Sequence, residues 1–192
     1  MKKLFVIIVA SVVAVAAEAQ NRYINISFSG NDMSLEGFPK LKSNYGLSFT
    51  AGRTFNLLGN NLRLGLDVSW IDLNYTNYKI KHITAEYTDN YFYHQGEISM
   101  QIGPSLTFNP GYLYINVYGR YSPALSCMYD NADLYGNYAT LFVTGGSVSY
   151  GRVGLGAEYR FGNCMYRNFT SSTPSDKAAD LSGWKAYITY RF

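Results

Sequence analysis

Leu62-Arg63-Leu64-Gly65-Leu66-Asp67-Val68-Ser69-Trp70 is the stretch that decides the fold. Its even-numbered positions are all apolar, and its odd-numbered positions hold Arg, Gly, Asp and Ser. Successive side chains of a β-strand point to opposite faces, so this alternation predicts a strand with one apolar and one polar face. No other regular element explains such a run.

The same period of two recurs along the rest of the chain. After residue 19, no stretch approaches the length of about 20 apolar residues that a membrane-spanning helix needs. The sixth alternating segment is the weakest, and the seventh and eighth are clean. The pattern predicts eight strands, at 23–29, 45–53, 62–70, 97–108, 113–121, 142–150, 153–162 and 184–192.

The connections between these segments alternate in length. Gly, Asn and Pro mark tight hairpin turns at 56–61, 109–111 and 151–152. Long polar connections fall at 30–44, 74–95, 122–139 and 167–183. Short turns at one end and long loops at the other are typical of outer-membrane barrels, whereas a lipocalin-like barrel or a sandwich would not need this asymmetry. We therefore expect an all-β, eight-stranded antiparallel barrel with up-and-down order, short periplasmic turns and long extracellular loops.

The composition agrees with such a barrel and excludes other classes. Of 192 residues, 19 are Tyr and only 15% are charged, against about 25% in ordinary soluble domains. A mean hydropathy of −0.11 does not fit a bundle of transmembrane helices. The net charge of +3 is too mild to indicate binding of nucleic acid.

The N-terminus predicts export. Met1-Lys2-Lys3 is basic, residues 4–15 are apolar apart from Ser11, and Ala17-Glu18-Ala19 is an A-x-A cleavage site. The alternative is a single membrane anchor, for which the apolar stretch is short. We expect a cleaved signal peptide at 1–19 and one barrel domain at 20–192.

The distribution of charge decides which face meets lipid. An eight-stranded barrel has a narrow interior, just wide enough to be filled by side chains, so the apolar face is expected to point outward to lipid and the polar face inward. Buried charges must pair, because an unpaired buried ion is very costly. We expect a plugged lumen, with a small gated pore that works by exchange of ion-pair partners as the alternative. The predicted lumen charge network is Arg63, Asp67, Glu97, Arg120, Glu158, Arg160, Lys185 and Arg191.

The eight segments, the signal peptide and the ending Tyr187-Ile188-Thr189-Tyr190-Arg191-Phe192 resemble the small outer-membrane barrels of the OmpA/OmpX type. The resemblance implies a barrel-only member in the outer membrane of a Gram-negative bacterium, surrounded by outer-membrane lipid, with a structural or surface-interaction role. It also implies that the barrel-assembly machinery reads the C-terminal signal. The residues that match this signal are Trp184, Ile188, Tyr190 and Phe192, with Ala186 a weak member.

Catalysis is the least favoured hypothesis. Some members of the family that the chain resembles are lipid-modifying enzymes, and a hydrolase of that kind needs a nucleophile, a base and an acidic residue close together. His94, Glu97 and Ser99 could form such a set, but no motif supports it. The scattered Cys and His residues show no metal-ligand spacing. We expect no catalytic residue, no metal and no cofactor.

Two features of the connections leave alternatives open. The connections 74–95 and 122–139 are rich in Tyr, which indicates either an extracellular ligand or strands that continue beyond the membrane; we favour continued strands. Cys127 and Cys164 belong to an exported chain, where a disulfide could form or both thiols could remain free.

Overall fold

A computed structural model describes residues 20–35, 40–83, 88–129, 133–170 and 176–192. The expected signal peptide, 1–19, lies outside these residues. The described residues contain no apolar helix of membrane-spanning length.

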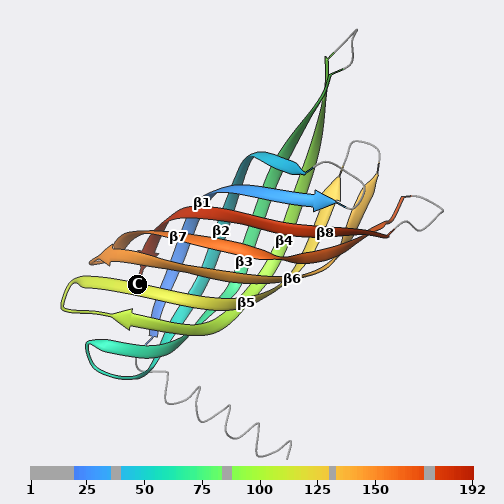
Figure 1. The fold of residues 1–192 in the computed structure, drawn as a ribbon. Helices are drawn as coiled ribbons and strands as arrows, with labels where there is room; N and C mark the ends of the chain where they lie inside the picture. Colours follow the sequence, from blue (N-terminus) through green and yellow to red (C-terminus); the bar gives the residue numbers. More distant parts are fainter. Residues whose placement is uncertain (1–19, 36–39, 84–87, 130–132, 171–175) are drawn as a thin grey trace, which may run out of the picture.

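The described chain forms one closed antiparallel barrel with its strands in sequence order (Figure 1). Consecutive strands pair with each other, and β1 pairs with β8 to close the sheet. The prediction of an eight-stranded meander barrel is confirmed. The strands are β1 (Gln20–Leu35), β2 (Leu41–Leu58), β3 (Leu62–Ile83), β4 (Thr88–Phe108), β5 (Leu113–Tyr129), β6 (Leu134–Tyr150), β7 (Val153–Asn168) and β8 (Asp176–Arg191).

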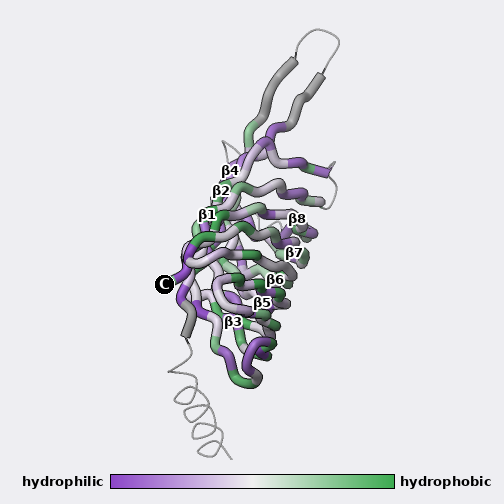
Figure 2. The backbone as a smooth tube through the Cα atoms, turned by 90° about the vertical axis from the view of Figure 1, so that its left-hand side faces the viewer, coloured by the Kyte–Doolittle hydropathy of each residue, from purple (hydrophilic) through white to green (hydrophobic). Residues whose placement is uncertain are grey.

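The predicted strand boundaries are wrong at one end of the barrel, which we call the loop end. Most of 30–44, 74–95, 122–139 and 167–183, predicted as long connections, is strand. The favoured alternative for 74–95 and 122–139, continued strands, is therefore the observed one. The β3–β4 hairpin extends farthest beyond the other strands (Figure 1), and hydrophobic and hydrophilic residues follow one another along the strands of the barrel (Figure 2). At the opposite end, which we call the turn end, β2 and β3, β4 and β5, and β6 and β7 are joined by short turns, as predicted.

Over most of the barrel, apolar side chains point outward and polar ones inward. Leu155 is 68% exposed on the outer wall, whereas Asn116 on the inner wall is 1% exposed. Such an outer face is stable against hydrocarbon, and closure of the barrel satisfies the backbone hydrogen bonds that lipid cannot. The predicted assignment of the two faces is therefore observed.

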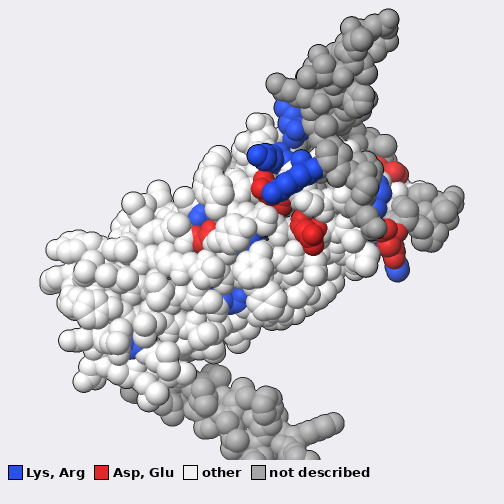
Figure 3. Space-filling view, in the orientation of Figure 1, with Lys and Arg blue, Asp and Glu red and all other residues white. Residues whose placement is uncertain are grey.

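Toward the loop end this polarity inverts. The inner wall there carries a set of buried side chains that we call the loop-end core, while Lys42, Asp176 and Asp180 are exposed on the outside. Charged side chains of both signs gather at this end (Figure 3). Apolar side chains inside and charged ones outside are what water favours, so the apolar outer belt ends below this level. The loop-end core is Met33, Leu35, Leu41, Tyr78, Ala124, Met128, Tyr135, Ala139, Leu141, Cys164, Tyr166, Ala179 and Leu181.

A bulge in β3 changes which residues face inward. Ser69 pairs with Gln101 and Asp72 with Ser99, so β3 has one residue more than β4 over this interval. Trp70 and Ile71 are consecutive, yet both are about half exposed on the outer wall. The alternation therefore shifts by one residue, and Asp72 faces the lumen.

Candidate functional site

Buried ion pairs occupy the barrel interior in three layers. The lowest layer joins β3 to β5: Arg120 Nη2 lies 2.8 Å from Asp67 Oδ1. Tyr23 and Thr54 each donate a hydrogen bond of 2.7 Å to the same carboxylate. The guanidinium also lies over the Tyr118 ring, 3.5 Å from its centroid. This layer therefore ties together four of the eight strands.

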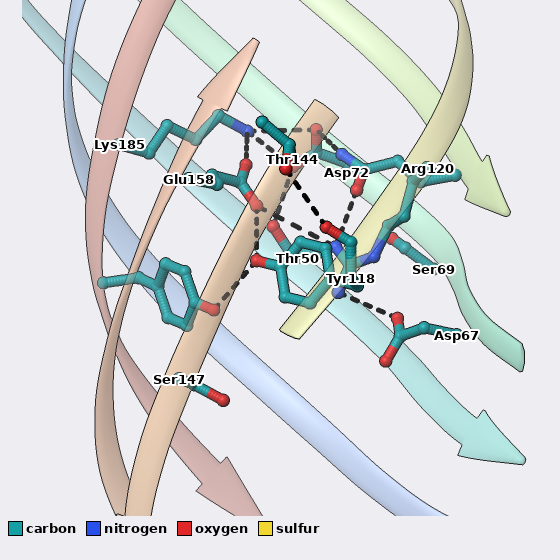
Figure 4. A network of polar contacts seen from close by, with 12 residues as sticks. Thr50, Asp67, Ser69, Asp72, Tyr118, Arg120, Thr144, Ser147, Glu158 and Lys185 are labelled. Carbon is teal, nitrogen blue, oxygen red and sulfur yellow. Dashed lines mark hydrogen bonds and ion pairs between the residues drawn. The ribbon is translucent and has the colours of Figure 1, made fainter. Parts of the chain in front are cut away.

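The middle layer is centred on Lys185 of β8 (Figure 4). Its Nζ lies 3.1 Å from Asp72 Oδ2 and 3.2 Å from Glu158 Oε1. Asp72 accepts further hydrogen bonds from Thr50, Ser99, Asn74 and Gln101. Glu158 also lies 3.8 Å from Arg120 Nη1, so the lower and middle layers share one carboxylate.

The upper layer lies beneath the loop-end core. Glu97 pairs with Arg160 across the lumen, and Gln95 Nε2 donates to Glu97 Oε1 at 2.9 Å. Gln95 also donates to the Tyr166 hydroxyl at 2.8 Å. Because Tyr166 belongs to the loop-end core, the polar network and the apolar core are in direct contact.

Arg191 is the one predicted lumen residue that is buried without a carboxylate partner among the described residues. It is 7% exposed, and its Nη2 donates to Ser147 Oγ at 3.2 Å. Its guanidinium lies 3.9 Å from the centroid of the Tyr114 ring and 5.6 Å from that of Tyr23. The negative faces of these rings stabilise the cation in place of an ion pair.

Seven of the eight predicted lumen charges are buried in the interior, and Arg63 is the exception. Its side chain is partly exposed at the turn end, where Nε donates to the backbone oxygen of Asn60. Arg63 has the expected orientation in β3, but it lies too close to the turn to reach the network. The prediction that it belongs to the lumen network is therefore wrong.

Asp72 is the functional residue that the sequence reasoning missed. The alternation of 62–70, continued without a break, would turn this carboxylate outward. The signal that could have revealed the bulge is the apolar pair Trp70-Ile71, after which Asp72, Asn74 and Thr76 alternate in the opposite phase. With Asp72 included, the described part of the chain buries four acids and four bases: Asp67, Asp72, Glu97, Glu158, Arg120, Arg160, Lys185 and Arg191.

The Ser–His–acid set considered from the sequence is not assembled. The His94 ring stacks on Tyr75, whose side chain is exposed, and its Nδ1 lies 2.7 Å from the Tyr75 hydroxyl. Ser99 Oγ donates to Asp72 at 3.2 Å, while Glu97 is paired with Arg160. Each of the three groups thus has another partner.

The two cysteines do not form a disulfide. Both thiols are free, with Cys127 exposed and Cys164 buried in the loop-end core. Cys127 follows the outward phase of β5 and Cys164 the inward phase of β7, so the barrel wall separates the two side chains. The disulfide considered from the sequence is therefore absent.

The four residues of the predicted C-terminal signal share the outer face. Trp184, Ile188, Tyr190 and Phe192 are all exposed. Trp184 lies 6.2 Å from the Phe28 ring, and Tyr190 lies 5.1 Å from the Phe192 ring, both as centroid distances. Aromatic side chains at the two ends of a lipid-facing belt are typical of outer-membrane barrels.

Comparison with known proteins bears on the fold. No protein-family model matches the sequence, and no curated protein matches it. Neisserial surface protein A (NspA) is similar in structure, with a TM-score of 0.50 at 17% identity over 89% of this chain and 97% of NspA. The outer membrane protease OmpT from Escherichia coli has a TM-score of 0.51 at 10% identity over 90% of this chain and 96% of OmpT. The attachment invasion locus protein Ail of Yersinia pestis has a TM-score of 0.45 at 12% identity over 90% of this chain and 98% of Ail.

At these identities the likeness concerns the fold and carries no activity from one protein to another. The fold of this chain is that of the small outer-membrane β-barrels.

Proposed function

We propose that this chain is a structural protein of a Gram-negative outer membrane: a plugged barrel whose loop end faces the cell surface. An outer wall of exposed apolar side chains supports the membrane location. Charged side chains on the outer wall at the loop end support the exposure of this end to water.

The filled interior is the observation that carries the plugged state. Each of the eight lumen charges is at most 7% exposed. Three ion-pair layers cross the lumen, and the loop-end core lies above them. An ion that crosses the barrel would have to pass both the charged layers and the apolar core, so two different barriers oppose conduction.

Planar-bilayer recording tests this proposal. Purified, folded protein is expected to give no steady conductance above that of the bare bilayer. A large, steady conductance would contradict the plug. A matched variant, Leu181→Ala with Met128→Ala, removes side-chain volume from the loop-end core and leaves the ion pairs intact. It should also give no steady conductance, because the ion-pair layers still fill the lumen.

A small gated pore is the second candidate function. The contacts of Glu158 with two cations favour it. This carboxylate contacts both Lys185, at 3.2 Å, and Arg120, at 3.8 Å, so it can change its principal partner with a small movement. A gated pore predicts brief openings whose frequency changes in Glu158→Gln. A plugged barrel predicts no openings in either protein.

A surface-interaction role is carried by the β3–β4 hairpin. The last β2–β3 pair is Ser43 with Tyr78, and the last β4–β5 pair is His94 with Tyr129. Beyond them, within the described residues, β3 and β4 pair only with each other, up to Ile83 with Thr88. Such a ribbon presents unpaired strand edges to a partner.

Removal of residues 80–91 tests this role. The shortened hairpin should abolish adhesion of producing bacteria to cultured epithelial cells and leave the folded, heat-modifiable band on a detergent gel. Unchanged adhesion would contradict the role.

A further inference from the structure

The outer wall holds a small pocket near the loop end, where β2, β1, β8 and β7 are consecutive around the barrel (Figure 1). Its volume is 310 Å³, at the lower end of the range of about 300–1,000 Å³ that is usual for small-molecule sites. Aromatic side chains line the side toward the turn end, and charged and polar side chains line the side toward the loop end. The pocket therefore lies where the apolar belt gives way to the charged loop end.

The aromatic side of the pocket is formed by Phe28, Tyr159 and Trp184, all exposed on the outer wall. The Phe28 and Trp184 rings lie 6.2 Å apart between centroids. Trp184 pairs in register with Gly30 on one side and with Tyr159 on the other. A Cβ atom on Gly30 would lie 2.6 Å from the indole Nε1, so the missing side chain at this position gives the indole its place at the pocket.

The opposite side of the pocket carries charge of both signs. Asp32 of β1 pairs in register with Lys42 of β2, and both line the pocket. Asp32 Oδ2 also lies 2.8 Å from Lys40 Nζ, and a carboxylate can accept further hydrogen bonds beside this one. A charged ligand would be repelled by one of the two signs, whereas a hydroxyl can donate to the carboxylate or accept from the ammonium.

A bulge in β2 adds an amide to the same side of the pocket. Ser43 pairs with Tyr78 and Tyr45 with Asn77, so Asn44 is an extra residue of β2 in its ladder with β3. Asn44 and Tyr45 are consecutive, yet both are exposed, and Asn44 lines the pocket. Bulges commonly re-aim a side chain toward a site. The bulge therefore brings both a donor and an acceptor beside the two charges.

We propose that this pocket binds the sugar ring of a neutral glycolipid in the leaflet that surrounds the loop end. A pyranose ring has C–H groups on its faces and hydroxyls around its edge, so it matches an aromatic wall that faces a polar rim. The acyl chains of the lipid lie along the outer wall, over Phe28 and Leu47. A phosphate head group is disfavoured because the Asp32 carboxylate repels it. This inference rests on the proposed membrane location and orientation.

Native mass spectrometry of protein released from phosphatidylcholine nanodiscs tests the site, with equal amounts of monoglucosyl diacylglycerol and phosphatidylglycerol as probes. The wild type should retain the glucosyl lipid in preference to phosphatidylglycerol, and the absence of this preference would overturn the proposal. Asp32→Ala with Lys42→Ala removes two charge-assisted hydrogen bonds without changing the net charge. Retention of the glucosyl lipid should therefore fall by about tenfold or more. Tyr159→Leu keeps the polar rim and should also lower retention, because one aromatic wall is lost.

Arg167→Ala with Asp176→Ala is the matched control, because it removes another exposed ion pair from the loop end. It should retain as much glucosyl lipid as the wild type. Equal losses in the two double variants would overturn the site, as would no loss in either. Displacement of the lipid by millimolar methyl glucoside, which has no acyl chain, would overturn the assignment to a lipid. Failure of the wild type to enter nanodiscs would instead contradict the membrane location, and the gel mobility of unheated protein shows that each variant is folded.

Discussion

Lys185 Nζ lies 3.1 Å from Asp72 Oδ2, although 113 residues separate the two in the chain. The contact exists because the bulge at Trp70 and Ile71 turns Asp72 inward and because closure brings β8 around to face β3. It joins the first half of the chain to the last strand through the middle of the lumen. The stability of the closed barrel therefore depends on a local irregularity in β3.

Replacement of Asp72 is expected to destabilise the barrel. Asp72→Ala leaves the Lys185 ammonium with one carboxylate instead of two, and loss of a partner from a buried pair costs about 3–5 kcal/mol. The free energy of unfolding, measured by urea titration in detergent micelles, should fall by about this amount. In Asp72→Leu with Lys185→Met the loss should be smaller, because one acid and one base are removed together and Glu158 keeps Arg120 as a partner at 3.8 Å. Equal stability of Asp72→Ala and wild type would contradict the role of this pair.

Deletion of Ile71 is expected to be tolerated. It removes the one extra residue of β3 and leaves Ser69 and Asp72 facing inward, so regular pairing with β2 and β4 is restored. Deletion of Leu73 should prevent folding, because Asn74 and Thr76 would turn to the outer wall and Tyr75 to the lumen. The shift between heated and unheated samples on a detergent gel measures both results. Identical behaviour of the two deletions would contradict the assignment of the bulge.

The two thiols are expected to differ in reactivity. Burial raises the pKa of the Cys164 thiol to about 12, so the reactive thiolate is scarce at pH 8 and increases only as the pH approaches 12. N-ethylmaleimide should label one site per folded chain at pH 8, at the exposed Cys127, and two sites after unfolding. Cys127→Ser serves as the control and should leave the folded protein unlabelled. Rapid labelling of Cys164 in the folded barrel would contradict its burial.

Loss of Phe192 is expected to affect assembly in cells more than stability. Its side chain is exposed on the outer wall and packs against Tyr190, so its removal leaves the lumen intact. The amount of folded barrel in cell membranes should decrease severalfold, whereas refolding of purified protein into detergent should proceed as in wild type. Tyr150→Ala, which removes another exposed aromatic residue, should leave assembly unchanged. Equal losses in the two variants would indicate a general effect of aromatic residues and no specific C-terminal signal.

The barrel itself could be predicted because alternation over 62–70, 97–108 and 153–162 survives in the structure. The ends of the strands could not, because the prediction assumed apolar side chains outside throughout. In β1, Asn31, Met33 and Leu35 keep the period of two, but the apolar side chains now point inward. The same period with the opposite polarity does not indicate a lipid-facing strand, so the sequence predicts a connection there.

The interior could be predicted only in part. The side of the sheet on which Glu97, Glu158 and Lys185 lie follows from local alternation, and all three are in the lumen. Their partners depend on strand register and on the bulge, which are properties of neighbouring strands and not of one segment. Alternation alone does not predict that Arg63 lies beside its turn. Nor does it predict that an aromatic ring is the partner of Arg191.

The inversion of polarity toward the loop end fixes the height of the barrel in its membrane. A downward shift would bring Asp180 and Lys42 into hydrocarbon, and an upward shift would bring Phe28 and Leu47 into water. Both displacements cost free energy, so the barrel fits a bilayer whose hydrocarbon thickness equals the height of its apolar belt. A thicker or thinner bilayer must deform around it, and this mismatch selects the membrane in which the protein is most stable.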